Sequence, residues 1–128
     1  MSLTNSFETS VLTWLLTAGT PSPVRPTAWY LGLFTAAPGE AGGGTELSGN
    51  AYARQAITFT VSGDTASNNA ALEFPTATAS WGTITHVAVF DALTVGNMIA
   101  YATLTASKVI DTGDVLRIPT NDLDITLT

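Results

Sequence analysis

Apolar residues recur at helical spacing near the start of the chain. Asn5 and Glu8 have the spacing of a capping box in front of them, and Gly19 follows them as a stop signal. The pattern predicts a helix over residues 5–18, followed by a Pro-rich linker over 19–27. One stripe of the helix collects most of the apolar side chains, and two leucines widen it: Phe7, Val11, Trp14, Leu15 and Ala18, with Leu12 and Leu16.

From residue 28 onward the chain consists of short apolar or alternating runs separated by Gly, Asn, Asp and Pro, which is typical of strands. In the second run, one face is mostly apolar and the other carries Thr58 and Thr60, as in a half-buried antiparallel strand. The predicted strands are Ala28–Phe34, Tyr52–Val61, Ala70–Phe74, Thr83–Phe90, Met98–Leu104, Val115–Ile118 and Leu123–Leu127.

The connections between these runs indicate an antiparallel arrangement. Gly96-Asn97 and Asp111–Asp114 are short enough for hairpins, whereas the glycine-rich stretch Pro38–Asn50 is too long for one and is either a functional excursion or a crossing between sheets. No second helix is available as a parallel crossover. We therefore expect an all-β fold, an antiparallel β-sandwich or jelly roll, that forms a single domain over 1–128 with one N-terminal α-helix.

The helix stripe has two interpretations. It closes the open end of the β core, or it docks against a neighbouring subunit. Only 11% of the residues are charged, well below the roughly 25% typical of soluble domains, which favours a chain that hides part of its surface in an assembly. The residues that we expect at an assembly contact are Phe7, Val11, Trp14 and Leu15.

The net charge limits the classes of molecule that the chain is expected to bind. Ten acidic residues against four basic ones give a formal net charge of -6, which opposes both nucleic-acid phosphates and anionic membranes. The four cations, Arg25, Arg54, Lys108 and Arg117, are scattered, so they form no basic patch. Cysteine is absent, which excludes disulfides and thiolate catalysis. We expect no nucleic-acid partner and no membrane association.

Two motifs contain residue types that catalysis or metal binding uses. Asp111-Thr112-Gly113 is the aspartic-protease triplet, but Asp-Thr-Gly-Asp is also an ordinary turn, and too little chain follows it for the rest of a protease half. His86 is the single histidine and shares a strand face with Ile84, Ala88 and Phe90, which indicates a structural residue. We therefore expect no catalytic residue, no cofactor and no metal centre of the common types.

Two further groups of residues leave alternatives open. Asp111, Asp114, Asp122 and Asp124 form either a calcium site without EF-hand spacing or a solvated acidic edge. Arg54 is expected to pair with a carboxylate such as Glu46. Several aromatic residues are either core or platforms for a sugar: Trp14, Trp29, Tyr30, Tyr52, Trp81 and Tyr101.

Three blocks in order resemble a family of small tailed-bacteriophage virion proteins, usually described as tail fibre or minor structural proteins. The blocks are Leu31-Gly-Leu-Phe34 with Pro38-Gly-Glu40, Gly49-Asn-Ala-Tyr-Ala-Arg54, and Ser80-Trp-Gly-Thr-Ile-Thr-His86. The resemblance spans nearly the whole chain, and Val87-Ala-Val89 departs from it where a glycine is frequent. It implies a non-enzymatic structural subunit and brings no catalytic residue.

The resemblance leaves the role on the particle open. A compact low-charge domain suits head decoration or cementing, and also a unit associated with the tail fibre or tail tip. We expect a symmetric homo-oligomer, with a trimer as one option, in contact with other virion proteins. The alternative is a receptor-recognising carbohydrate-binding module in which Trp29, Trp81 or the Pro38–Asn50 loop holds a host surface glycan.

Overall fold

The computed structural model describes residues 1–127 and consists mainly of antiparallel strands with one short helix. The six-stranded sheet has the order β1-β9-β8-β2-β3, and β4 also pairs with β2. Its strands are β1 (Ser2–Leu3), β2 (Tyr30–Ala36), β3 (Thr45–Glu46), β4 (Gln55–Ala56), β8 (Gly82–Phe90) and β9 (Met98–Ile110). The predicted all-β class with an N-terminal helix is confirmed.

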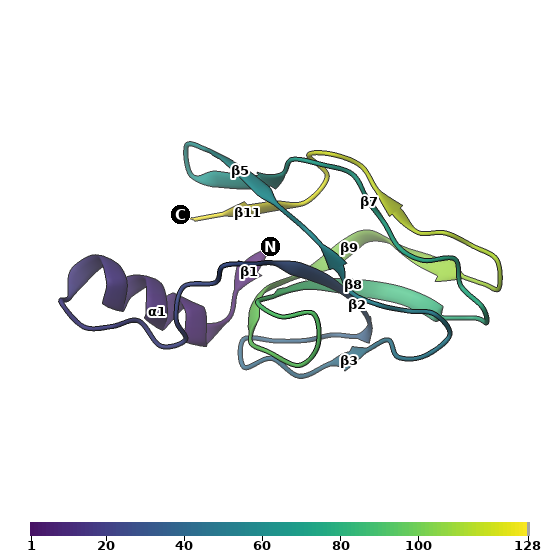
Figure 1. Ribbon diagram of the computed structural model, residues 1–128, viewed down its shortest axis with the longest axis horizontal. Coiled ribbons are helices and arrows are strands. Elements are labelled where there is room, and N and C mark those ends of the chain that lie inside the picture. Colours follow the sequence, from purple (N-terminus) through teal and green to yellow (C-terminus); the bar gives the residue numbers. More distant parts are fainter. Residues whose placement is uncertain (128) are drawn as a thin grey trace.

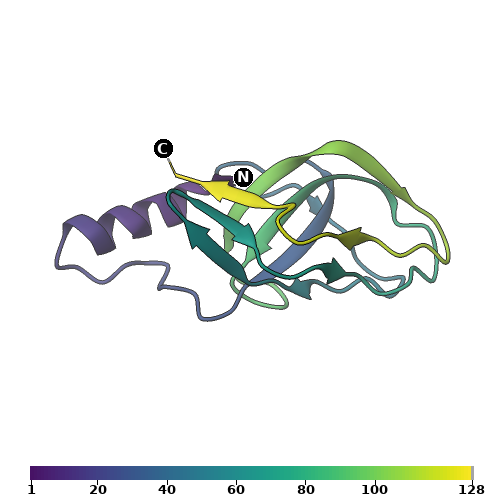
Figure 2. The same cartoon turned by 90° about the horizontal axis from the view of Figure 1, so that it is seen from above.

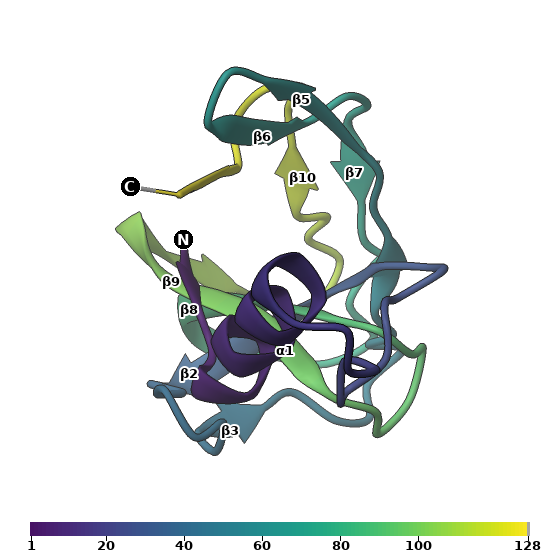
Figure 3. The same cartoon turned by 90° about the vertical axis from the view of Figure 1, so that its left-hand side faces the viewer.

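Two smaller sheets lie over one face of the large sheet, as Figure 3 shows. One pairs β10 (Arg117–Ile118) with β7 (Leu72–Glu73), and the other has the order β11-β6-β5. The strands of the latter are β5 (Phe59–Ser62), β6 (Thr65–Asn68) and β11 (Asp124–Thr126). All these pairings are antiparallel.

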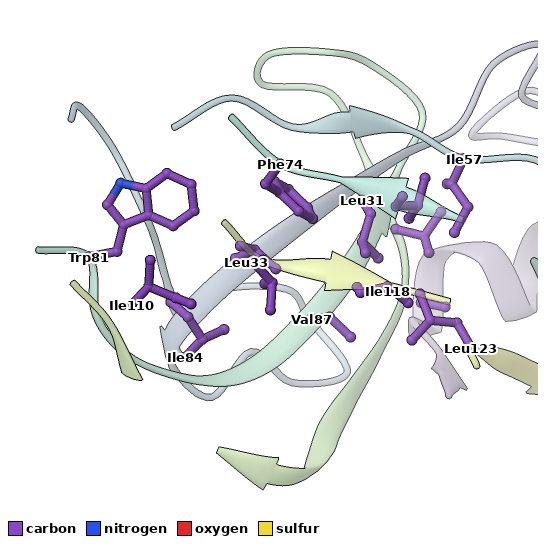
Figure 4. Close-up of a cluster of buried hydrophobic side chains, with 14 of the residues drawn as sticks. Leu31, Leu33, Ile57, Phe74, Trp81, Ile84, Val87, Ile110, Ile118 and Leu123 are labelled. Atoms are coloured by element: carbon purple, nitrogen blue, oxygen red, sulfur yellow. The ribbon is translucent and has the colours of Figure 1, made fainter. Parts of the chain in front are cut away.

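The main hydrophobic core fills the space between the large sheet and the small ones (Figure 4). Leu33 and Val87 point into it from the large sheet, and Phe74 and Ile118 meet them from the other side. Because successive side chains of a strand point to opposite faces, Phe34, Ala88 and Phe90 form a second, smaller cluster on the outer face. The large sheet is thus buried on both sides near its centre.

The predicted strands differ from the observed ones mainly at their ends. The run Tyr52–Val61 is divided into β4 and β5, and β9 continues six residues beyond the predicted end at Leu104. Three strands were not expected: β1, β3 and β6. The first two contain only two residues each, too few for a period to emerge from the sequence.

The connections followed the predictions in part. Gly96-Asn97 lies in the loop that joins the antiparallel strands β8 and β9, as expected. Asp111–Asp114 is a tight turn, but it leads from the large sheet to β10 in a small sheet and is not a hairpin. Within Pro38–Asn50, β3 folds back and pairs with β2, so this glycine-rich stretch contains the second strand of a hairpin. The expectation that the stretch is too long for a hairpin is therefore wrong.

Helix α1 (Asn5–Leu16) ends two residues before the predicted boundary, because Thr17 is already extended. The predicted capping box at Asn5 is wrong. Asn5 is the first helical residue, Thr4 is the N-cap and makes no side-chain capping bond, and its hydroxyl instead donates to the carbonyl of Met98 on β9 at 2.7 Å. The start of α1 is therefore fixed by the sheet.

The buried residues of α1, Phe7 and Ser10, lie in its first half. Phe7 enters the main core, and the Ser10 hydroxyl donates to the carbonyl of Pro23 in the linker at 2.7 Å. The second half projects beyond the β strands (Figures 1 and 2). The first half of α1 thus covers part of the core, as one of its two interpretations expected, whereas its second half lies beyond the core.

Asn68 joins the small sheets at a fully buried position. Its amide nitrogen donates to the carbonyls of Ala70 and Pro119 at 3.0 and 2.9 Å, and its side-chain oxygen accepts from the N–H of Leu123 at 2.9 Å. Three main-chain groups thus depend on one side chain. This explains why a polar residue is kept inside the core.

We predict that Asn68→Ala lowers the free energy of unfolding by about 3 kcal/mol, because it leaves those main-chain groups without partners. Asn69→Ala is the matched control, since Asn69 is exposed and bonds only threonine hydroxyls; it should cost less than about 1 kcal/mol. Urea titration followed by tryptophan fluorescence measures both. Equal losses for the two variants would contradict this role.

Candidate functional site

Arg54 lies buried, 8% exposed, beside the outer face of the large sheet. Its Nε and Nη2 donate to the two oxygens of Glu46 at 2.8 and 2.7 Å, a bidentate pair. Its Nη1 donates to the carbonyls of Ala92 and Val95 at 2.9 and 2.8 Å, in the β8–β9 loop. The expected pairing of Arg54 with Glu46 is confirmed, and one side chain ties β3 to that loop.

The guanidinium also lies over an aromatic ring. The Cζ atom of Arg54 is 3.5 Å from the centroid of the Phe90 ring, within the range of a cation–π interaction. The ring of Phe34 stacks with Phe90 at a centroid distance of 6.1 Å. The outer apolar cluster is therefore covered by a charge that is itself neutralised by Glu46.

Tyr52 completes the arrangement around the Glu46 carboxylate. Its hydroxyl donates to Oε2 of Glu46 at 2.6 Å and accepts from the N–H of Leu33 at 3.0 Å. Burial, followed by the hydrogen bond to Glu46, raises the pKa of Tyr52 well above its ordinary value. Gly32 leaves room for this contact, because a Cβ there would lie 2.8 Å from the same carboxylate oxygen.

A cleft of about 610 Å³ opens on the outer face of the large sheet, beside the cluster that Arg54, Glu46 and Tyr52 form. Phe34, Phe90 and Met98 line its apolar part. Its walls come from three segments that are distant in the sequence: residues 4–6 at the start of α1, residues 40–44 of the glycine-rich loop, and residues 96–97 of the β8–β9 loop. No local sequence signal connects these segments, so sequence reasoning missed the cleft.

The residues expected at an assembly contact have two different environments. Phe7 is buried in the chain's own core. Val11 is half-buried, and Trp14 and Leu15 are 66% and 62% exposed on the projecting half of α1. Leu12 and Leu16, 57% and 72% exposed, extend the uncovered surface of the helix. The projecting half of α1 is thus apolar and faces solvent.

The aspartate motif forms a turn. The N–H of Asp111 donates to a carboxylate oxygen of Asp114 at 2.8 Å, and Gly113 has the positive φ that such a turn requires. Asp124 accepts a hydrogen bond from the Ser67 hydroxyl. Within residues 1–127 no group of three or more acidic or histidine side chains is placed to hold a metal ion, so the four aspartates are not brought together as a calcium site.

His86 lies on the outer face, but not with all of its expected neighbours. A register shift between Ile84 and His86 places Ile84 in the main core. His86 pairs across strands with Phe34, whose cluster contains Ala88 and Phe90. Its Nδ1 lies 2.7 Å from the Thr85 hydroxyl. The expected grouping with Ala88 and Phe90 is correct, and the grouping with Ile84 is wrong because of the bulge.

The two tryptophans named for the glycan-binding alternative, Trp29 and Trp81, are engaged with the core. Trp81 is 5% exposed, and its indole N–H donates to the carbonyl of Asn50 at 2.9 Å. Trp29 is half-buried and packs against the same core. The third element named for glycan binding, the glycine-rich loop, borders an open cleft.

Comparison with known proteins agrees with the resemblance. The model of the family described as "Podophage GP4 fiber I protein gp80" matches residues 2–126. No curated protein matches the chain. The match covers nearly the whole sequence and confirms the resemblance to a phage tail fibre family. Within residues 1–127, no helix has the length and apolar character needed to cross a membrane.

We predict that Arg54→Lys lowers the free energy of unfolding by roughly 2–4 kcal/mol, because lysine cannot make the bidentate pair and also reach the two loop carbonyls. Arg117→Lys is the control, since Arg117 is exposed on β10. Urea unfolding measures both variants. A loss at Arg54 no larger than at Arg117 would show that the cluster does not hold the loops together.

We predict a second effect at alkaline pH. The folded protein keeps the Tyr52 proton to higher pH than the unfolded chain, whose phenol titrates near 10.0. The resulting stability is present below pH ~10 and is lost as pH rises further. Tyr52→Phe should therefore show a flatter fall in unfolding free energy between about pH 10 and 12 than the unmodified protein. Parallel curves from urea titrations would contradict it.

Proposed function

Because the chain belongs to the podophage GP4 fiber I protein gp80 family, we propose that it is a non-enzymatic structural subunit of a phage tail fibre. The family description favours the tail over head decoration or cementing, the other location considered. We also propose that the chain forms a single domain over 1–128 whose stacked antiparallel sheets make a β-sandwich. Its localisation is then the virion, after assembly in the host cytoplasm.

The projecting half of α1 is the observation that carries this proposal. A helix that stands clear of its own domain with Trp14 and Leu15 more than 60% exposed is unfavourable in isolation. Burying a large apolar side chain contributes roughly 1.5–3 kcal/mol. Several such residues on one short helix therefore favour a docked state, which fits a subunit that works within a particle.

In this proposal, Phe7 has a different role from the other residues expected at the assembly contact. It anchors the helix in the chain's own core, while Val11, Trp14 and Leu15 form the contact with a neighbour. The neighbour is either another copy or another virion protein. We propose a symmetric homo-oligomer, with a trimer as the first number to test, in contact with other fibre components.

We predict that Trp14→Ala and Leu15→Asp reduce assembly without unfolding the domain, because both side chains lie outside the core. The readouts are native mass by light scattering, incorporation into particles in a phage complementation assay, and the circular dichroism spectrum. Val61→Asp is the control, since Val61 is 71% exposed on β5 and is not part of α1.

The outcomes separate assembly from folding. The proposal expects both helix variants to lose native mass or incorporation while the spectrum stays unchanged and Val61→Asp behaves as the unmodified protein. Retention of native mass and incorporation by both helix variants would overturn the assembly role of α1.

A further inference from the structure

The cleft on the outer face of the large sheet contains polar groups that the fold leaves free. One oxygen of the Glu40 carboxylate accepts from the Tyr101 hydroxyl at 2.6 Å and from the Ser2 hydroxyl at 3.5 Å. Within residues 1–127 the other oxygen makes no hydrogen bond. The Asn97 amide nitrogen donates to Asp91 at 2.9 Å, and the Asn97 side-chain oxygen accepts no hydrogen bond from the described part of the chain. These are acceptors suited to hydroxyl groups.

The charges around the cleft select against anions. Glu40 and Glu46 line it, and the chain as a whole carries a net charge of -6. Arg54, which pairs with the cleft residue Glu46, is already committed to that carboxylate and to two loop carbonyls. A phosphate or carboxylate ligand would therefore meet repulsion from Glu40, and Arg54 is not available to offset it. A neutral ligand meets no such penalty.

The apolar part of the cleft suits the carbon skeleton of a small polar ligand. Phe34 and Phe90, which stack with each other, line this part, and Met98 adds a flexible apolar side chain. The volume of about 610 Å³ lies in the range of small-ligand sites, roughly 300–1,000 Å³. A mixed lining of this kind fits a molecule with both hydroxyls and C–H surface.

The walls of the cleft are held in place before any ligand arrives. Arg54 fixes the β8–β9 loop through the carbonyls of Ala92 and Val95, and the N–H of Asn5 donates to the carbonyl of Glu40 at 2.9 Å. Asp91 accepts from both the N–H and the amide of Asn97. A site whose walls are already ordered loses less entropy on binding.

From these observations we propose that the cleft binds a neutral saccharide unit, with Glu40 and Asn97 accepting hydrogen bonds from its hydroxyls. The inference goes beyond the structural role proposed above, because it assigns a ligand site on a surface distinct from the projecting half of α1. Assembly through α1 and binding in the cleft use different residues, so each can fail without the other.

The test is a ¹H–¹⁵N NMR titration of the intact protein with galactose, glucose, N-acetylglucosamine and rhamnose, and with sialic acid and glucose 6-phosphate as anionic probes. At least one neutral sugar should shift the amide signals of Ser6, Gly43 and Asn97 at millimolar concentration, which is the affinity expected for a single sugar unit. The anionic probes should leave these signals unchanged.

Two variants test whether the sugar binds in the cleft. Glu40→Gln keeps the acceptor for Tyr101 but removes the charge, and it should weaken binding roughly fivefold or more, since hydrogen bonds to a charged acceptor are about twice as strong. Ala41→Trp fills the cleft from an exposed position and should abolish binding. Trp14→Ala is the control and should bind as the unmodified protein does.

The proposal is overturned by any of three results: no neutral sugar shifts the lining residues up to about 100 mM, the anionic probes bind more tightly than the neutral ones, or the shifts persist in both Glu40→Gln and Ala41→Trp. Loss of sugar binding in Trp14→Ala would also contradict it, because the site would then depend on assembly.

Discussion

The segments on the outer face of the large sheet depend on one buried guanidinium. Arg54 pairs with Glu46, holds the carbonyls of the β8–β9 loop and covers the ring of Phe90. A buried charge is tolerated only where its hydrogen bonds are satisfied, and here four are made. The arrangement fixes β3, a two-residue strand that its own ladder bonds could not hold. The position of β3 in turn places the glycine-rich loop and so shapes the cleft that this loop borders.

The inner half follows a different principle, the burial of apolar surface between sheets. The large sheet supplies Leu33 and Val87 to the main core, and the small sheets cover them with Phe74 and Ile118. Helix α1 contributes Phe7 to this core and then leaves it. The molecule therefore buries apolar side chains between its sheets but leaves those of the projecting half of α1 exposed, an arrangement that fits the assembly proposed above.

The sequence predicted those features that depend on local periodicity. The helix, the long strands β2, β8 and β9 and the turn at Asp111–Asp114 come from spacing and turn chemistry, and the Arg54–Glu46 pair comes from the scarcity of cations. Strand β3 lies close to β2 in the sequence, but its two residues are too few to show a period. Strand β1 and the cleft could not be predicted, because they form only when distant segments meet. The capping box failed for the same reason: the Thr4 hydroxyl binds Met98 on β9, a partner that lies 94 positions away.

Membership of a fibre family and an apolar helix that stands clear of the β strands lead to one central claim, that this chain is a component of the tail fibre. Immunogold electron microscopy of intact particles of the phage that encodes the chain, with an antibody raised against the recombinant protein, tests it most directly. The account predicts gold on the tail fibres. Label confined to the head, or absent from the particle, would contradict it.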